Sequence, residues 1–127
     1  MGCIFCKIID SRSEDFIYED EKAVVLVSKL QTSHGHIIVT LKKHYENIND
    51  ISEEDYLHLQ KLVKKYYEKL HKNFEPEKIY ILLLAEEIAH IHFHLIPRYR
   101  GDATGPKFLM DDIKEVKNSN KIIEKLI

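Results

Sequence analysis

The stretch "HIHFHLIPRY", residues 90–99, places three histidines at alternating positions with apolar residues between them. In a β-strand, side chains at positions i, i+2 and i+4 point to one face of the sheet. The stretch therefore predicts a strand over 89–99 with an imidazole face and a buried apolar face. For eight histidines in 127 residues, chance gives about 0.03 alternating triplets, so composition alone does not explain the pattern.

The rest of the chain predicts four more strands and one long helix. Runs rich in β-branched and aromatic residues at 16–19 and 23–27 flank a charged turn and indicate a hairpin. Residues 36–40 and 78–84 are predicted as further strands. Ser52, followed by three acidic residues, is typical of a helix start, and apolar residues then recur every three or four positions. We expect this helix to cover 53–72.

Together these elements predict a single α+β domain over residues 1–127. Its five-stranded, largely antiparallel sheet would have the long helix inserted between strands three and four. A C-terminal helix is expected over 110–127, interrupted near 118–120.

Charge and hydropathy limit the partners. The formal net charge is -2, so we expect no basic face for nucleic acid or a membrane surface, although a nucleotide-sized anion stays possible. No run of eighteen apolar residues occurs and charged residues follow the first few positions at once, so we expect neither a membrane span nor a signal peptide. A cytoplasmic protein is expected.

Three imidazoles on one strand face allow two kinds of chemistry. Two of them could share a metal ion, with a third ligand from elsewhere and a water completing the shell, as in hydrolytic zinc sites. Alternatively, one imidazole attacks phosphorus while its neighbours position the phosphate oxygens. The spacing alone leaves both open.

Three stretches of the sequence carry a family resemblance. His90 to Ile96 matches the histidine triad pattern, His-φ-His-φ-His-φ-φ with φ apolar, and residues 97–102 are also similar to members of that family. The opening at 3–9 resembles the usual start of the family, and 35–39 with the Lys-Lys-His at 42–44 resembles its third strand and following turn. The chain is identified as resembling the histidine triad (HIT) family over 3–102, with 103–127 as a variable tail.

The resemblance implies a nucleotide hydrolase or nucleotidyl transferase acting on the α-phosphate of nucleoside phosphoramidates or dinucleoside polyphosphates. It implies His92 as the nucleophile, with its other ring nitrogen held by a backbone carbonyl. His94 would donate to phosphate oxygens, and His36 would orient the pair. The implied partners are a purine nucleotide or its conjugate and a second copy of the chain, the sheets pairing in a homodimer.

The nucleotide site implied by the resemblance departs from the family at three positions. Ser28 stands where an aspartate usually holds the ribose hydroxyls. Glu86 and Glu87 stand where glutamine and a hydroxyl residue usually help to bind phosphate, and a carboxylate near phosphate is repulsive. The residues that match the usual base sandwich are Ile4, Phe5, Ile8 and Leu26. These departures favour an alternative function, a zinc-stabilised nucleotide-binding module with weak or no turnover.

Cys3 and Cys6 form a CxxC pair, which in a reducing compartment more often binds metal than forms a crosslink. By the same resemblance, His44 and His90 would complete a structural zinc site with them. A third hypothesis, a hydrolase with its metal at the histidine strand, predicts chelator-sensitive activity. Of the other histidines, His34 is expected at the surface, and 58 and 71 on the solvated side of the helix.

Overall fold

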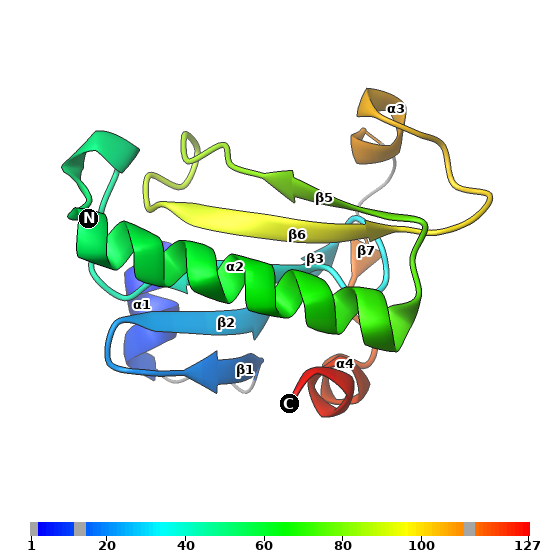
Figure 1. Ribbon diagram of the computed structural model, residues 1–127, viewed down its shortest axis with the longest axis horizontal. Coiled ribbons are helices and arrows are strands. Elements are labelled where there is room, and N and C mark those ends of the chain that lie inside the picture. Colours follow the sequence, from blue (N-terminus) through cyan, green and yellow to red (C-terminus); the bar gives the residue numbers. More distant parts are fainter. Residues whose placement is uncertain (1–2, 12–14, 111–113) are drawn as a thin grey trace.

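The computed structural model describes residues 3–11, 15–110 and 114–127 and is built around a five-stranded sheet (Figure 1). In chain order the elements are α1 (Ile4–Ser11), β1 (Phe16–Glu19), β2 (Ala23–Val27), β3 (Leu30–Gln31), β4 (Ile37–Leu41), η1 (Ile48–Asp50), α2 (Glu53–Phe74), β5 (Lys78–Leu82), β6 (His92–Arg98), α3 (Pro106–Leu109), β7 (Lys114–Glu115) and α4 (Ser119–Leu126). The strand order is β1-β2-β4-β6-β5, and every neighbouring pair is antiparallel. The predicted α+β fold, with the long helix between β4 and β5, is confirmed.

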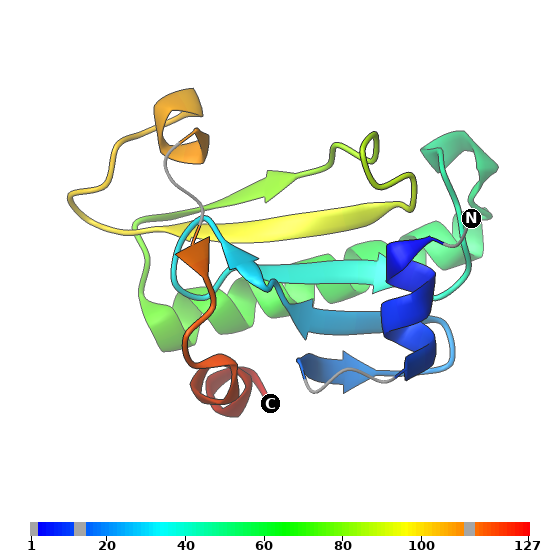
Figure 2. The same ribbon diagram turned by 180° about the vertical axis from the view of Figure 1, so that it is seen from behind.

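The alternation of β6 divides the sheet into two faces. Phe93 and Leu95 belong to the apolar core that includes the buried side of α2, and α2 crosses this face in Figure 1. His92 points the other way and packs its ring against Phe5 of α1, at 4.5 Å between centroids. Figure 2 shows α1 on this opposite face. The period of two in the sequence therefore separates the core from the histidines.

Helix α2 begins and ends where its sequence signals lie. The Ser52 side chain accepts a hydrogen bond from the Asp55 amide at 3.2 Å, which caps the first turn. The helix ends at Glu75, whose backbone adopts the left-handed conformation with φ 51°, one residue before a proline. It runs two residues beyond the predicted 53–72, and its buried residues are Leu59, Leu62, Val63, Tyr66 and Leu70.

Helix α1 was not predicted from the sequence. Phe5 and Ile9 are buried in a small apolar cluster with Val24, Leu26 and Ile38 of the sheet. An eight-residue helix is too short to be stable alone, so this segment is helical because its apolar side packs on the sheet and its cysteines approach two histidines.

The C-terminal part differs from the helix predicted over 110–127. The described residues form the short strand β7, which pairs with β3, and then α4, which begins at the point where an interruption was expected. Residues 111–113 lie outside the described residues. Ile122 and Leu126 of α4 enter the main core, so non-local packing decides the structure of this segment. The division of the chain at residue 102 stays a prediction.

Smaller differences concern strand ends. The histidine strand covers 92–98 rather than 89–99, β5 ends at Leu82 rather than at 84, and β4 is shifted by one residue to 37–41. In the described ranges, none of the helices has the length and apolar character that crossing a membrane requires.

Candidate active site and metal centre

The sheet brings the three catalytic candidates together. His94 pairs with Ile38 across β4 and β6, and His36 lies directly before β4. The Nε2 atom of His36 is 2.8 Å from Nδ1 of His94, and the rings of His92 and His94 lie 4.8 Å apart. Adjacent antiparallel strands thus place side chains 58 residues apart in sequence within one hydrogen-bonded group.

The tautomer of His92 is set by the backbone. Its Nδ1 lies 2.6 Å from the carbonyl oxygen of His90. A carbonyl only accepts, so Nδ1 carries the proton and Nε2 keeps its lone pair. Burial lowers the pKa of His92, and the hydrogen bond to the carbonyl opposes this only in part. The ring is therefore neutral near pH 7, with Nε2 as its nucleophilic atom.

His36 and His94 form a directional chain of hydrogen bonds. The backbone amide of Thr32 donates to Nδ1 of His36 at 3.1 Å. His36 must then carry its proton on Nε2 and donate it to Nδ1 of His94, which leaves the His94 proton on Nε2. Burial, aided by the neighbouring histidine, lowers the pKa of His36 to about 3 and that of His94 to about 4. Near neutral pH, His94 therefore offers an N–H donor and no charge.

The four metal-ligand candidates also converge. One ligand atom from each of Cys3, Cys6, His44 and His90 lies within 4.8 Å of the others. Nδ1 of His90 is 3.4 Å from Sγ of Cys3 and 3.6 Å from Sγ of Cys6, and Nδ1 of His44 is 3.5 Å from Sγ of Cys6. Tetrahedral Zn–S and Zn–N bonds of normal length place nitrogen and sulfur about 3.6 Å apart, so the cluster could hold a metal ion.

Both histidines of this cluster have their other nitrogen occupied. Nε2 of His90 lies 2.8 Å from the Leu41 carbonyl, and Nε2 of His44 lies 3.1 Å from a carboxylate oxygen of Glu46. These acceptors favour a proton on Nε2 and direct the Nδ1 lone pairs toward the sulfurs, as the outer partners of metal-bound histidines do.

The two thiols of the cluster differ. Burial alone would raise the pKa of Cys3, but hydrogen bonds from the Cys6 amide and thiol outweigh it, and the pKa lies below its ordinary value. Burial, together with the adjacent Cys3 sulfur, raises the pKa of Cys6. Cys3 therefore loses its proton before Cys6, and a bound metal ion would stabilise both thiolates.

The predicted nucleotide-binding residues are more dispersed. Phe5 and Leu26 are buried in the small apolar cluster, Ile8 is half-buried beside it, and Ile4 is 53% exposed. The Ser28 hydroxyl is buried and donates to the Leu30 carbonyl at 2.7 Å. The structure brings Phe5 against His92.

Glu86 and Glu87 lie in the loop between β5 and β6 and are both exposed. Within this loop, Ala85 has a φ of 43°, which falls in the left-handed region that favours glycine. The neighbouring Ile88 packs against the apolar cluster that contains Phe5, so the loop borders the face of the sheet that carries the histidines.

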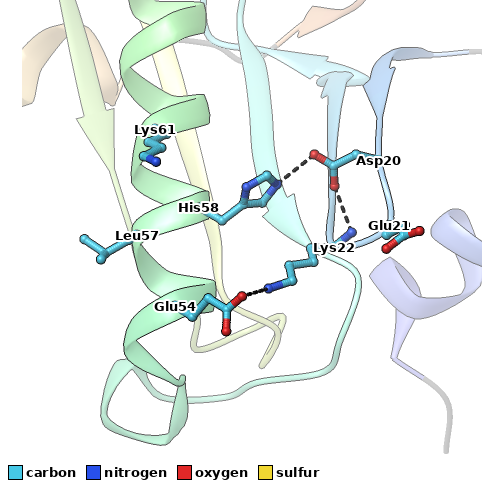
Figure 3. A pocket seen from close by; sticks show the side chains of 7 residues that line it. All are labelled: Asp20, Glu21, Lys22, Glu54, Leu57, His58 and Lys61. Atoms are coloured by element: carbon cyan, nitrogen blue, oxygen red, sulfur yellow. Dashed lines mark hydrogen bonds and ion pairs between the residues drawn. The ribbon is translucent and has the colours of Figure 1, made fainter.

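A second polar region lies between α2 and the β1–β2 turn. The cavity of about 550 Å³ in Figure 3 is lined by Asp20, Glu21, Lys22, Glu54, Leu57, His58 and Lys61. His58, expected to be solvated, is instead half-buried and lies 2.7 Å from the Asp20 carboxylate. Hydrogen bonds from Tyr18, the turn amides and His58 lower the pKa of Asp20 despite its burial.

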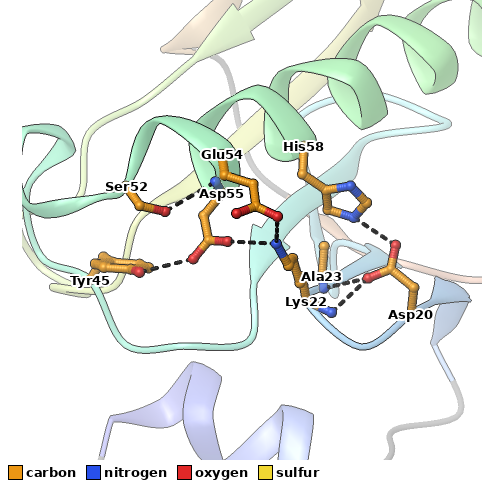
Figure 4. A network of polar contacts seen from close by, with 8 residues as sticks. All are labelled: Asp20, Lys22, Ala23, Tyr45, Ser52, Glu54, Asp55 and His58. Atoms are coloured by element: carbon orange, nitrogen blue, oxygen red, sulfur yellow. Dashed lines mark hydrogen bonds and ion pairs between the residues drawn. The ribbon is translucent and has the colours of Figure 1, made fainter.

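These polar groups anchor the start of α2. Figure 4 shows Lys22 bridging Glu54 and Asp55 at 2.9 and 3.1 Å, while the Tyr45 hydroxyl donates to Asp55 at 3.0 Å. These contacts tie the β1–β2 turn to the start of α2.

Sequence reasoning missed several groups that support the site. Gln31, Thr32 and Glu46 contact histidines or their loop, and the carbonyls of Leu41 and His90 fix two ring nitrogens. Glu46, two residues after His44, could have been noticed as an outer partner. Backbone carbonyls carry no sequence signal.

The antiparallel sheet, with two histidines of the triad on an inner strand and the third just before it, defines the class of the protein, and the chain belongs to the HIT family. The family profile described as HIT domain matches residues 11–101. An uncharacterised HIT-like protein of Methanocaldococcus jannaschii is 37% identical over 121 residues, covering 91% of this chain and 90% of its own.

Two further comparisons agree. Adenosine 5'-monophosphoramidase hnt1 of Schizosaccharomyces pombe is 32% identical over 104 residues, covering 77% of this chain and 75% of its own. The crystal structure of a hypothetical histidine triad nucleotide-binding protein of Sulfolobus tokodaii matches with a TM-score of 0.79 and 27% identity, covering 98% of this chain and 89% of the other. The resemblance found in the sequence is confirmed at the level of the family.

Proposed function

We propose that the protein is a nucleotide hydrolase or nucleotidyl transferase that attacks the α-phosphate of nucleoside phosphoramidates or dinucleoside polyphosphates through His92. The observation that carries this proposal is the 2.6 Å hydrogen bond from Nδ1 of His92 to the His90 carbonyl. It leaves the Nε2 lone pair on a neutral imidazole, which is the form that can attack phosphorus. The phosphoramidase activity named for the Schizosaccharomyces pombe relative supports the choice of substrate.

In the proposed reaction, Nε2 of His92 bonds to the α-phosphorus in line with the leaving group. The P–N or P–O bond to the leaving group breaks with its electron pair on the leaving group: an amine takes up a proton from solvent, whereas a nucleoside phosphate leaves as an anion. The Nε2–H of His94 donates to a phosphate oxygen and stabilises the charge that develops there. Water then cleaves the bond between phosphorus and His92, which releases the nucleotide and restores the imidazole.

We also propose a structural zinc at Cys3, Cys6, His44 and His90. The donor set, the spacing of the ligand atoms and the outer partners of both histidines fit this metal. A zinc ion bound by all four residues would fasten α1 to the sheet and leave no open coordination position for chemistry. Two thiol ligands have to stay reduced, which is consistent with the cytoplasm as the proposed location.

Of the two other functions considered, the nucleotide-binding module has a specific observation in its favour. Glu86 and Glu87 are exposed on the loop that borders the histidine face, where negative charge opposes phosphate. The metal hydrolase is less well supported. Within the described residues the metal-competent cluster includes His90, while His92 and His94 have other partners.

A homodimer is proposed from the free edge of the sheet. β5 is the last strand in the sheet order and presents Ile81 at 50% exposure. An apolar edge strand is a template for pairing with another chain.

The function is tested by incubating the protein with adenosine 5'-phosphoramidate and with diadenosine polyphosphate and measuring AMP release. His92→Ala should reduce AMP release by about 10⁴-fold or more, as removal of a nucleophile does. His71→Ala, at an exposed position of α2, is the control and should leave the rate unchanged. AMP binding without turnover in the unsubstituted protein would favour the binding module. Undiminished release by His92→Ala would exclude His92 as the nucleophile.

A further inference from the structure

The direction of the hydrogen bonds between His36 and His94 depends on one backbone group. Each ring nitrogen in this pair could donate or accept, and only the Thr32 amide, which can do nothing but donate, decides between the two arrangements. If Thr32 moved away, Nδ1 of His36 could hold the proton instead. The proton of His94 could then lie on Nδ1, and its Nε2 would present a lone pair instead of an N–H to the substrate.

The loop that holds this amide is closed by the side chain of Gln31. Gln31 is only 8% exposed. Its Nε2 donates to the carbonyls of Ser28 and, at 2.8 Å, of His36. Its Oε1 accepts from the amides of Gly35 at 3.2 Å and of His36 at 3.3 Å. One side-chain amide therefore contacts both ends of the segment that carries Thr32.

The orientation of the Gln31 amide is determined by these partners. Both groups near Nε2 are carbonyls and both groups near Oε1 are N–H donors, so a flipped amide would lose all four hydrogen bonds. Gly35 adds a second constraint, since its φ is 92° and a Cβ there would lie 3.2 Å from the ring of Phe74. The four hydrogen bonds and the close contact at Gly35 restrict the conformation of the loop.

We infer that Gln31 is a positioning residue that fixes the Nε2–H tautomers of His36 and His94 by holding the Thr32 amide against His36. This inference rests on the proposed function for its catalytic consequence, because the Nε2–H of His94 is the donor to the phosphate oxygen. Gln31 itself touches no reacting atom. Its side chain acts through the loop, then through His36, and then through His94.

The test replaces Gln31 with methionine, which is similar in length and forms none of the four hydrogen bonds. The tautomers of His36 and His94 are read from long-range ¹H–¹⁵N spectra of the substrate-free protein, where protonated and unprotonated ring nitrogens are well separated. We expect both rings to be Nε2–H in the unsubstituted protein and Gln31→Met to give a mixture of tautomers. The kcat for AMP release should fall by about 10²-fold, the effect of a small misplacement, with KM changed much less.

Two further variants complete the design. Gln60→Met makes the same chemical change on α2, where the side chain is half-buried, and should leave tautomers and kcat as they were. Gln31→Glu retains both accepted hydrogen bonds but places a carboxylate oxygen against the two carbonyls that Nε2 contacts, so it should displace the loop and shift the tautomers in the same direction. If Gln31→Met does not fold, Gln31→Glu provides the test of the positioning role.

Each outcome has one meaning. Tautomers in folded Gln31→Met or Gln31→Glu that equal those of the unsubstituted protein would overturn the inference, whatever happens to the rate. A tautomer change accompanied by the fall in kcat would support it together with the proposed function. A tautomer change in a protein that releases no AMP even when unsubstituted would support the positioning role and overturn the proposed function.

Discussion

Histidines that are close in sequence differ in which ring nitrogen is hydrogen-bonded. His90 and His92 are two residues apart, yet Nε2 of His90 is held by Leu41 and Nδ1 of His92 by the carbonyl of His90. The free lone pair is therefore on Nδ1 in His90, where the cysteines lie, and on Nε2 in His92. At this scale the site is defined by which ring nitrogen is occupied.

The buried histidines predict a loss of stability in mild acid. Unfolded histidine has a pKa near 6.5, while His36 and His94 in the fold have pKa values of about 3 and about 4. Below pH 6.5 the unfolded chain therefore binds more protons, so the free energy of unfolding falls as the pH is lowered toward 4. Each of the two histidines contributes a loss of about 2 kcal/mol between pH 7 and pH 5, measurable by urea denaturation.

His36→Asn provides the comparison for this prediction, because other titrating groups are the same in both proteins. Its loss of unfolding free energy between pH 7 and pH 5 should be smaller than that of the unsubstituted protein by about 2 kcal/mol. Equal losses in the two proteins would contradict the prediction that burial keeps His36 neutral in the folded state.

The residues of the candidate site could be predicted from the sequence, but the hydrogen-bond partners of their ring nitrogens could not. The period of two and the family resemblance identify His36, His92 and His94, since side-chain direction in a strand follows from sequence position. The role of Gln31 escaped prediction because its four partners are backbone groups, and their convergence depends on how the loop closes.

At the scale of elements, α1 is the part that depends most on the proposed metal. It is eight residues long. Its residue Phe5 lies between the two cysteines in the sequence and packs its ring on His92. Removing zinc with a chelator should lower the melting temperature by about 10 °C, because a ligand bound only to the folded state stabilises it.

Cys6→Ser is the matched variant for the chelator experiment. It should melt at a lower temperature even without chelator, and the chelator should then have little further effect. Elemental analysis should find one zinc per chain in the unsubstituted protein. Less than about 0.2 zinc per chain after purification without chelator would count against a closed site.

The loop between β5 and β6 supplies a prediction about binding. In the proposed nucleotide site the exposed carboxylates of Glu86 and Glu87 would repel phosphate, so Glu86→Gln and Glu87→Gln should each bind AMP about 5-fold more tightly, which corresponds to about 1 kcal/mol in a solvated site. Glu124→Gln, on an exposed position of α4, should not change the dissociation constant measured by calorimetry. Weaker binding by the loop variants would mean that the glutamates contact a donor group of the ligand.

The long helix α2 and the strands of the main sheet were predicted well, whereas the two-residue strands were not predicted. The period of α2 extends over 22 residues, and its cap is local in sequence, so both are visible without a structure. β3 and β7 have two residues each and exist only because they pair with each other across 83 residues of chain. The helix predicted over 110–127, with its interruption near 118–120, is confirmed at Ser119–Leu126 and wrong at Lys114–Glu115, where β7 forms.

At the scale of the whole molecule, one face of the sheet packs the main core and the other face carries the candidate site. α2 and α4 cover one face and contribute to the main core, while α1 lies on the other face (Figures 1 and 2). His92 and the metal-ligand cluster lie beside α1. The free edge at β5 then offers a way to join two copies without covering either face.

This arrangement predicts that Ile81→Lys disrupts the proposed homodimer. A charged side chain on an edge strand opposes pairing with another chain. Light scattering should give twice the 15.0 kDa chain mass for the unsubstituted protein and a single chain mass for Ile81→Lys. Leu57→Lys, at an exposed position of α2, is the control and should remain dimeric. A 15 kDa particle for the unsubstituted protein would refute the dimer.

The most direct test of the account is to look for the covalent intermediate. The protein is mixed with adenosine 5'-phosphoramidate, quenched rapidly in alkali, where a phosphorus–nitrogen bond survives, and its peptides are analysed by mass spectrometry. We predict one adenylyl group on His92 in the unsubstituted protein and none in His92→Asn, with Nε2 as the attacking atom. Rapid AMP release with no adduct at any quench time, or an adduct on another residue, would contradict nucleophilic attack by His92.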